Sequence, residues 1–146
     1  MDIVIGSDHA GLSMKAAIVS HLNSLGHKVV DKGTHTADSI DYPDYAKAVA
    51  DSVTSGEASL GVLICGTGQG MSMAANKVNG IRSAVVSDAF SARAVREHNN
   101  ANVLCLGQRV IGEGLALDLV DAFITQEFAG GRHERRVNKI IALEQG

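Results

Sequence analysis

Aromatic side chains are scarce in this sequence, which has no tryptophan, three phenylalanines and two tyrosines among 146 residues. Proteins that hold single-stranded nucleic acids stack the bases on exposed aromatic rings, so this composition offers no platform for such contacts. Proline is rarer still, with a single residue at Pro43. No proline-rich linker and no low-complexity segment interrupts the chain.

The sequence also lacks an excess of positive charge. Thirteen lysines and arginines stand against 16 aspartates and glutamates, which gives a formal net charge of −3. Nucleic acids and anionic membranes are bound largely through basic surfaces, so neither is an expected partner. An anionic ligand would have to be held by a local cluster of charges.

Long apolar runs and a basic N-terminal segment are absent as well. The opening residues MDIVIG predict neither a secretory signal nor a membrane-spanning helix. Two cysteines, Cys65 and Cys105, each lie in an apolar run. The sequence alone leaves open a disulfide between them, but nothing indicates an oxidising compartment. We therefore expect a cytoplasmic protein.

What the sequence does contain is a regular alternation of apolar runs and helical patterns. Its length fits one domain spanning residues 1–146. Five strands separated by helices predict an α/β protein, a Rossmann-like three-layer α/β/α sandwich with a five-stranded parallel sheet. The apolar runs predict strands at residues 3–5, 29–30, 60–65, 84–86 and 103–106. The intervening patterns predict helices over residues 12–25, 45–53, 71–78, 89–97, 115–123 and 132–143.

Glycine-rich and polar segments are placed around these strands. Right-handed crossovers bring the loops that follow parallel strands to the carboxyl edge of the sheet, where open α/β sheets bind ligands. We therefore expect a functional site at that edge. The segments expected to form it are residues 6–11, 65–70, 98–100 and 130–136.

The loop of residues 66–70 leaves a buried strand and enters a predicted helix. Its amides can converge on an anion, and Thr67 adds a hydroxyl donor; a glycine turn for close packing is the alternative. Met71 stands where a G-x-G-x-x-G nucleotide fingerprint needs glycine. Cys65, the last residue of the strand, is either a small buried hydrophobe or a thiol activated by the loop. Cys105 has no such loop, and we expect it in the core.

The charged candidates each have a functional and a structural interpretation. Asp8 and His9 end the first strand, where they contact a ligand or where the aspartate caps the next helix. His98 ends a helix, a position that also favours histidine through the helix dipole. Arg132 and Arg136 share one helical face and suit a phosphate, although such pairs are commonly solvated. Without close Cys-x-x-Cys or His-x-x-x-His pairs, no metal site is expected.

Taken in order, these motifs resemble the type B ribose-5-phosphate isomerases, a family that includes galactose-6-phosphate and allose-6-phosphate isomerases. The similarity runs almost from end to end of the chain. It rests on SDHAG at 7–11, DYP at 41–43, CGTG at 65–68, ANK at 75–77, HN at 98–99, NVL at 102–104, G-x-R at 107–109 and GGRHxxRV at 130–137.

The resemblance implies an enzyme that interconverts ribose 5-phosphate and ribulose 5-phosphate through a cis-enediolate, without a metal or another cofactor. It implies that Cys65 takes the proton from C2 of the sugar and that Thr67 with the loop amides holds the enediolate oxygens. It also implies that His98 opens the furanose ring with help from Asp8. The remaining substrate contacts that it implies are His9, Tyr42, Gly66, Gly68, Gly70, Asn99, Arg109, Arg132 and Arg136.

The family is dimeric, which implies a homodimer with shared active sites, a dimer of dimers being the alternative assembly. His98 and Arg109 would then serve the neighbour's site. The chain departs from the family pattern at Asn100, where aspartate is common, and at Gln69 and Met71, which are bulkier than usual. These departures are expected to reshape the sugar end of the pocket. Allose 6-phosphate, galactose 6-phosphate or a tetrose phosphate is therefore an alternative substrate.

Two other classes of protein share part of this pattern. A phosphosugar-binding regulator would need the loop and the arginines but would not need Cys65. A nucleotide-dependent enzyme of similar fold would need an acid about 20 residues beyond the loop, near Asp88. The loop itself does not fit that second class.

Overall fold

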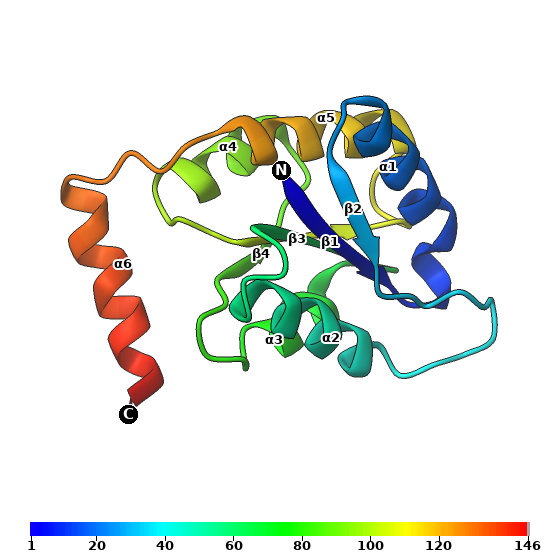
Figure 1. Ribbon diagram of the computed structural model, residues 1–146, viewed down its shortest axis with the longest axis horizontal. Helices are drawn as coiled ribbons and strands as arrows, with labels where there is room; N and C mark the ends of the chain where they lie inside the picture. The colour runs from blue at the N-terminus through cyan, green and yellow to red at the C-terminus, as the bar shows by residue number, and fades with distance from the viewer. Residues whose placement is uncertain (146) are drawn as a thin grey trace.

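The computed structural model describes residues 1–145, in which strands and helices alternate as the sequence predicts (Figure 1). The strands are β1 (Asp2–Ser7), β2 (Lys28–Asp31), β3 (Leu60–Cys65), β4 (Ser83–Val85) and β5 (Val103–Gly107). The α-helices are α1 (Leu12–Ser24), α2 (Tyr42–Thr54), α3 (Gln69–Ala75), α4 (Ala89–Glu97), α5 (Glu113–Thr125) and α6 (Arg132–Ala142). Two short 3-10 helices are η1 (His9–Gly11) and η2 (Leu143–Gln145).

The five strands form one parallel sheet in the order β2-β1-β3-β5-β4. Helices α1, α4 and α5 pack on one face of the sheet, and α2 and α3 pack on the other (Figure 1). This arrangement confirms the predicted α/β/α sandwich. The central strand β3 is buried along its whole length, because a parallel strand covered on both faces needs apolar side chains on each.

The strand order brings three loops together at the carboxyl edge of the sheet. From β3 the chain passes through α3 to the edge strand β4 and returns through α4 to β5, so β1, β3 and β5 are neighbours. In the register of the sheet, Ser7 lies opposite Ile64, and Cys65 lies opposite Gly107. The segments that follow these three strands therefore meet.

Most of the predicted helices differ from the structure by one to three residues at their ends, and two of these differences concern particular side chains or loops. We expected Leu25 on the apolar face of the first helix, but α1 ends at Ser24 and Leu25 is 53% exposed. The chain there is already turning into Gly26, with φ +87, so Leu25 no longer faces the sheet. Helix α3 begins at Gln69 rather than at Met71, directly after the loop.

The last helix stands apart from the sheet (Figure 1). Val137 is buried, whereas Ile140 and Ile141 on the same helix are 46% and 36% exposed. The end of this segment is held by the amide of Gly80, which donates to Oε1 of Glu144 at 2.8 Å. Within residues 1–145, no helix combines the length and the apolar character needed to span a bilayer.

Candidate active site

The thiol of Cys65 lies where the central strand enters the glycine loop. Its Sγ accepts a hydrogen bond from the backbone N–H of Gly68 at 3.0 Å. Gly68 has φ +82, a left-handed conformation that glycine adopts without strain, and this turn directs the amide back toward the sulfur. Cys65 is 6% exposed and free of any disulfide. A single free thiol fixed at the end of the central strand, at the ligand-binding edge of the sheet, is placed to act as a base or a nucleophile.

The glycine loop rests directly on the end of β5. A Cβ atom added at Gly107 would lie 2.7 Å from the carbonyl carbon of Thr67, and one added at Gly68 would lie 3.0 Å from that of Leu106. Thr67 is exposed, and its hydroxyl accepts from the amide of Gln69 at 3.3 Å. The position of Thr67 beside the thiol therefore depends on Gly107 having no side chain.

Asp8 and His9 follow β1 at the same edge. The amide of Asp8 donates to the carbonyl of Ile64 at 3.1 Å, which ties the ends of β1 and β3 together. Oδ1 of Asp8 accepts from the amide of Ala10 at 2.9 Å, so the capping role considered for this carboxylate is confirmed for that oxygen. Nδ1 of His9 accepts from the amide of Ile40 at 3.4 Å.

Tyr42 and Arg109 close this group from two other elements. Tyr42, the first residue of α2, lies so close to Gly70 that a Cβ atom there would overlap its ring. The side chain of Arg109 lies over Gly66, and the Arg109 amide donates to the Gly66 carbonyl at 3.0 Å. The carboxyl-edge cluster, as we call it, consists of Asp8, His9, Tyr42, Cys65, Gly66, Thr67, Gly68, Gly70 and Arg109.

His98 lies at the opposite edge of the sheet. Helix α4 runs back from the end of β4, so its C-cap residue His98 precedes the start of β5. In that connection Asn102 accepts from the amide of Gly61 at 2.9 Å, which marks the amino edge. The expectation that residues 98–100 join the loops at the carboxyl edge is therefore wrong within one chain, because α4 connects two parallel strands and returns the chain to the amino edge.

Arg132 and Arg136 share this second location. They lie on α6, whose His133 stacks on His98 with ring centroids 4.5 Å apart and an angle of 18° between the planes. The segment before α6 is also fixed to α4, since the amide of Ala129 donates to the carbonyl of Glu97 at 3.0 Å. The amino-edge cluster consists of His98, Asn99, Arg132, His133 and Arg136.

The two clusters are separated by the depth of the sheet. Strand β5 runs from the amino edge to the carboxyl edge in five residues, and a parallel strand of that length spans about 15 Å. In Figure 1, α6 lies at the left, whereas the arrowhead of β1 points to the right. Arg109, expected to serve a neighbour together with His98, instead lies with Cys65 of its own chain. Within residues 1–145, no group of three or more His, Cys, Asp or Glu side chains could hold a metal ion.

The departures from the family pattern have separate structural explanations. Asn100 has φ +48, a conformation that asparagine adopts more readily than most residues, and its Oδ1 accepts from Nη1 of Arg96 at 3.3 Å. Met71 is fully buried in the core between the sheet and α2 and α3. The expectation that Met71 reshapes the sugar pocket is therefore wrong. Gln69 is exposed beside Thr67 and is still a candidate for that effect.

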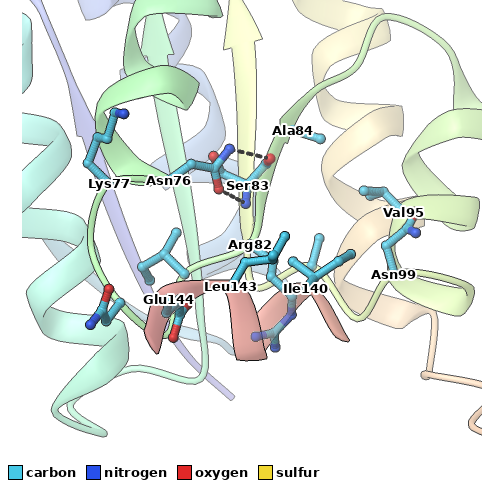
Figure 2. Close-up of a pocket in the computed structure, with 13 residues that line it drawn as sticks. Asn76, Lys77, Arg82, Ser83, Ala84, Val95, Asn99, Ile140, Leu143 and Glu144 are labelled. Atoms are coloured by element: carbon cyan, nitrogen blue, oxygen red, sulfur yellow. Dashed lines mark hydrogen bonds between the residues drawn. The ribbon is translucent and has the colours of Figure 1, made fainter. Parts of the chain in front are cut away.

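A groove of about 520 Å³ lies between β4 and the C-terminal segment (Figure 2). Asn99 of the amino-edge cluster lines it, together with Ile140 and Leu143, whereas the carboxyl-edge cluster does not. Asn76 covers the edge of β4 by accepting from the amide of Ser83 at 2.8 Å and donating to its carbonyl at 3.0 Å. Leu143 is 77% exposed, so the groove presents an apolar wall.

Gly107 is a residue of this site that the sequence analysis did not single out as functional. We expect Gly107→Ala to lower turnover more than tenfold, because a methyl group there displaces the Thr67 backbone and overpacks a buried contact. Steady-state kinetics with a sugar phosphate, alongside a melting curve, measure the two effects. Gly114→Ala is the control, since nothing lies within 4 Å of its added Cβ. Equal activity of the two variants would contradict the view that Gly107 determines the position of Thr67.

Comparison with known proteins identifies the family of the chain. The profile of the Ribose/Galactose Isomerase family matches residues 3–140. Ribose-5-phosphate isomerase B of Escherichia coli is 50% identical over 143 residues, covering 98% of this chain and 96% of that protein. The Clostridium thermocellum enzyme of the same name has a TM-score of 0.98 at 53% identity, covering 99% and 98% of the two chains. A Mycoplasma genitalium ribose-5-phosphate isomerase B structure with bound ribulose 5-phosphate has a TM-score of 0.94 at 46% identity, covering 99% and 96%. The chain therefore belongs to the ribose/galactose isomerase family.

Proposed function

We propose that this protein interconverts ribose 5-phosphate and ribulose 5-phosphate by moving one proton between C2 and C1 of the sugar. The observation that carries this proposal is the Cys65 thiol, held at the end of β3 by the amide of Gly68, within a family whose relatives are named ribose-5-phosphate isomerase B.

Cys65 acts as the base in this proposal. Its thiolate takes the proton from C2 of the open-chain aldose, and the electron pair of that C–H bond forms the C1–C2 double bond of a cis-enediolate. The thiol then returns the proton to C1, while the hydroxyl proton passes between the two oxygens. A positioned general base contributes about 10²- to 10⁴-fold to such a reaction.

Thr67 and the loop amides stabilise the enediolate. Negative charge develops on the oxygens of C1 and C2, and the hydroxyl of Thr67 with the amides of Gly66 and Gly70 provides donors, while the amide of Gly68 donates to the sulfur of Cys65. One donor of this kind is worth about 3–4 kcal/mol in the transition state. The tight contact of Gly107 with the Thr67 backbone supports this role, because donors act best when they are fixed in advance.

The other residues bind the sugar and its phosphate. His98 opens the furanose ring with Asp8, Tyr42 and Asn99 contact sugar hydroxyls, and the phosphate is held by His9, Arg109, Arg132 and Arg136. Arginine binds phosphate through two parallel hydrogen bonds, and an anchored phosphate places the reacting carbons over the base.

A second copy of the chain completes each site. His98, Arg132 and Arg136 lie at the other edge of the sheet from Cys65, so one chain presents two incomplete halves. A twofold dimer brings the amino-edge cluster of each chain to the carboxyl-edge cluster of the other and so forms two equal sites. The apolar groove beside Asn99 and the exposed Leu143 support a contact between copies on this side of the molecule.

The test of this function is direct conversion of substrate. The protein is incubated with four-, five- and six-carbon aldose phosphates, and the ketose product is followed for each. We expect ribose 5-phosphate to give the highest kcat/KM. Conversion of a tetrose or hexose phosphate with a higher kcat/KM would change the assigned substrate. Binding without conversion of any of them would indicate a phosphosugar-binding protein instead.

Removal of one phosphate ligand is expected to weaken two kinds of binding together. Arg136→Ala should raise KM for ribose 5-phosphate and the inhibition constant of inorganic phosphate, each by more than tenfold, because both depend on the same guanidinium. The fold should survive, since Arg136 is exposed. Arg135→Ala removes the neighbouring exposed charge on α6 and is the matched control. Unchanged inhibition by phosphate in the Arg136 variant would remove this residue from the clamp.

A further inference from the structure

His133 lies within the amino-edge cluster, and none of the proposed steps uses it. Its imidazole is stacked almost parallel on that of His98, with centroids 4.5 Å apart and 18° between the planes. One ring belongs to the C-cap residue of α4 and the other to α6, and the chain between these helices passes through β5 and α5. Backbone hydrogen bonds fix the main chain at both histidines. The His98 amide donates to the Ala94 carbonyl at 2.8 Å, and the His133 amide donates to the Gly130 carbonyl at 3.1 Å.

The charges around the pair are unequal. Arg132 and Arg136 adjoin His133 on α6, whereas on α4 the carboxylate of Glu97 lies 4.0 Å from Nε2 of His98. Partial burial, the nearby His98 and the two guanidiniums lower the pKa of His133, and Glu97 opposes this effect only in part. The positive charges therefore lie on the α6 side of the pair, and the carboxylate lies on the α4 side.

We propose that His133 is a positioning residue for His98: its stacked ring fixes the plane in which His98 meets the sugar. The role rests on the proposed opening of the furanose ring by His98. A stacked ring blocks rotation of the His98 imidazole on one face, so its nitrogen is presented to the substrate in one orientation.

Two substitutions separate the stacked ring from its nitrogens. His133→Phe keeps an aromatic ring against His98, and His133→Ala removes it. We expect His133→Ala to lower kcat for ribose 5-phosphate at least tenfold with KM and phosphate inhibition within about twofold of wild type. The phenylalanine variant should retain kcat within about threefold. Asn138→Ala, at an exposed position of α6, is the control for general effects on this helix.

The other outcomes overturn the proposal. Equal losses of kcat in both variants would show that a ring nitrogen of His133 acts directly. A loss of phosphate inhibition in both would make His133 a phosphate ligand. Unchanged kcat in His133→Ala would show that the stack has no role in turnover. Rescue by phenylalanine alone distinguishes positioning from each of these roles.

A second measurement tests the pair without any turnover. Proton NMR of the imidazole C2–H signals gives the pKa of His133 in the wild type and in His98→Asn. We expect the pKa of His133 to rise in the variant, because a neighbouring titratable ring has been removed. If this shift is present but no aldose phosphate is converted, the proposed function fails and the coupled pair remains. An unchanged His133 titration would contradict the pairing itself.

Discussion

Replacement of Cys65 by alanine is expected to lower kcat for ribose 5-phosphate by at least about 10²-fold, the low end for a lost general base. KM and inhibition by inorganic phosphate should stay near the wild-type values, because the arginines that hold the phosphate are untouched. The physical reason is specific to this thiol, whose sulfur accepts the Gly68 amide at 3.0 Å. The methyl side chain of alanine has no atom that can accept the C2 proton.

Cys105 provides the matched control within the same chain. Burial raises the pKa of its thiol to about 12, so it is protonated at neutral pH and unreactive. Cys105→Ala should therefore lose some stability but keep its turnover, and an alkylating reagent should modify one thiol per wild-type chain. Bound sugar phosphate should protect that thiol. Near-normal kcat in the Cys65 variant would assign the base to another residue.

Two inactive variants are expected to restore activity to each other when their chains assemble together. Cys65→Ala damages the carboxyl-edge cluster and His98→Asn damages the amino-edge cluster. In a mixed dimer one site carries both substitutions and the other carries neither. Random assortment makes half of the dimers mixed, so roughly a quarter of wild-type activity should return. Co-refolding the two purified chains and assaying ribose 5-phosphate conversion measures this recovery.

The control pairs two substitutions from the same edge. Cys65→Ala mixed with Thr67→Ala leaves every site damaged, because both residues belong to the carboxyl-edge cluster of one chain. This mixture should stay as inactive as its components. If the Cys65 and His98 variants also fail to complement while forming mixed dimers, each site is built from a single chain and the shared-site proposal is wrong.

The strands and most of the helices could be predicted because buried positions are apolar, and the spacing of apolar residues along the sequence differs between strands and helices. The run from Leu60 to Cys65 is apolar at every position since both faces of β3 are covered, and α4 spans the predicted residues 89–97. The prediction that Leu25 lies on the apolar face of the first helix is wrong, because the helical spacing of apolar residues continues in the sequence past the last residue of α1. The glycine loop and Cys65 could be singled out for the same local reason, as they directly follow a buried strand.

The distances between most of the site residues cannot be predicted from the local sequence, because these residues come from segments that are far apart along the chain. His98 is an exception, because it follows the predicted helix of residues 89–97, and a helix between parallel strands returns the chain to the amino edge of the sheet. Gly107 matters because any side chain there would overlap the backbone of Thr67. That proximity arises only when β3 and β5 are paired, so the sequence alone does not show it. His133 differs from Arg132 and Arg136 in facing His98, a contact between helices far apart in sequence. Its place within the GGRHxxRV segment was the one available indication.

The most direct test of the account is the fate of the C2 proton in heavy water. Ribose 5-phosphate is incubated in D₂O with the wild type, Cys65→Ala or Cys105→Ala, and NMR of the products reads deuterium at C1 and C2. The thiol that holds the C2 proton is expected to exchange it with solvent in part of the turnovers, so we predict deuterium at C1 of the ribulose 5-phosphate formed by the wild type and by Cys105→Ala, and none above background with Cys65→Ala. Exchange by Cys65→Ala at the wild-type rate would contradict proton transfer by Cys65.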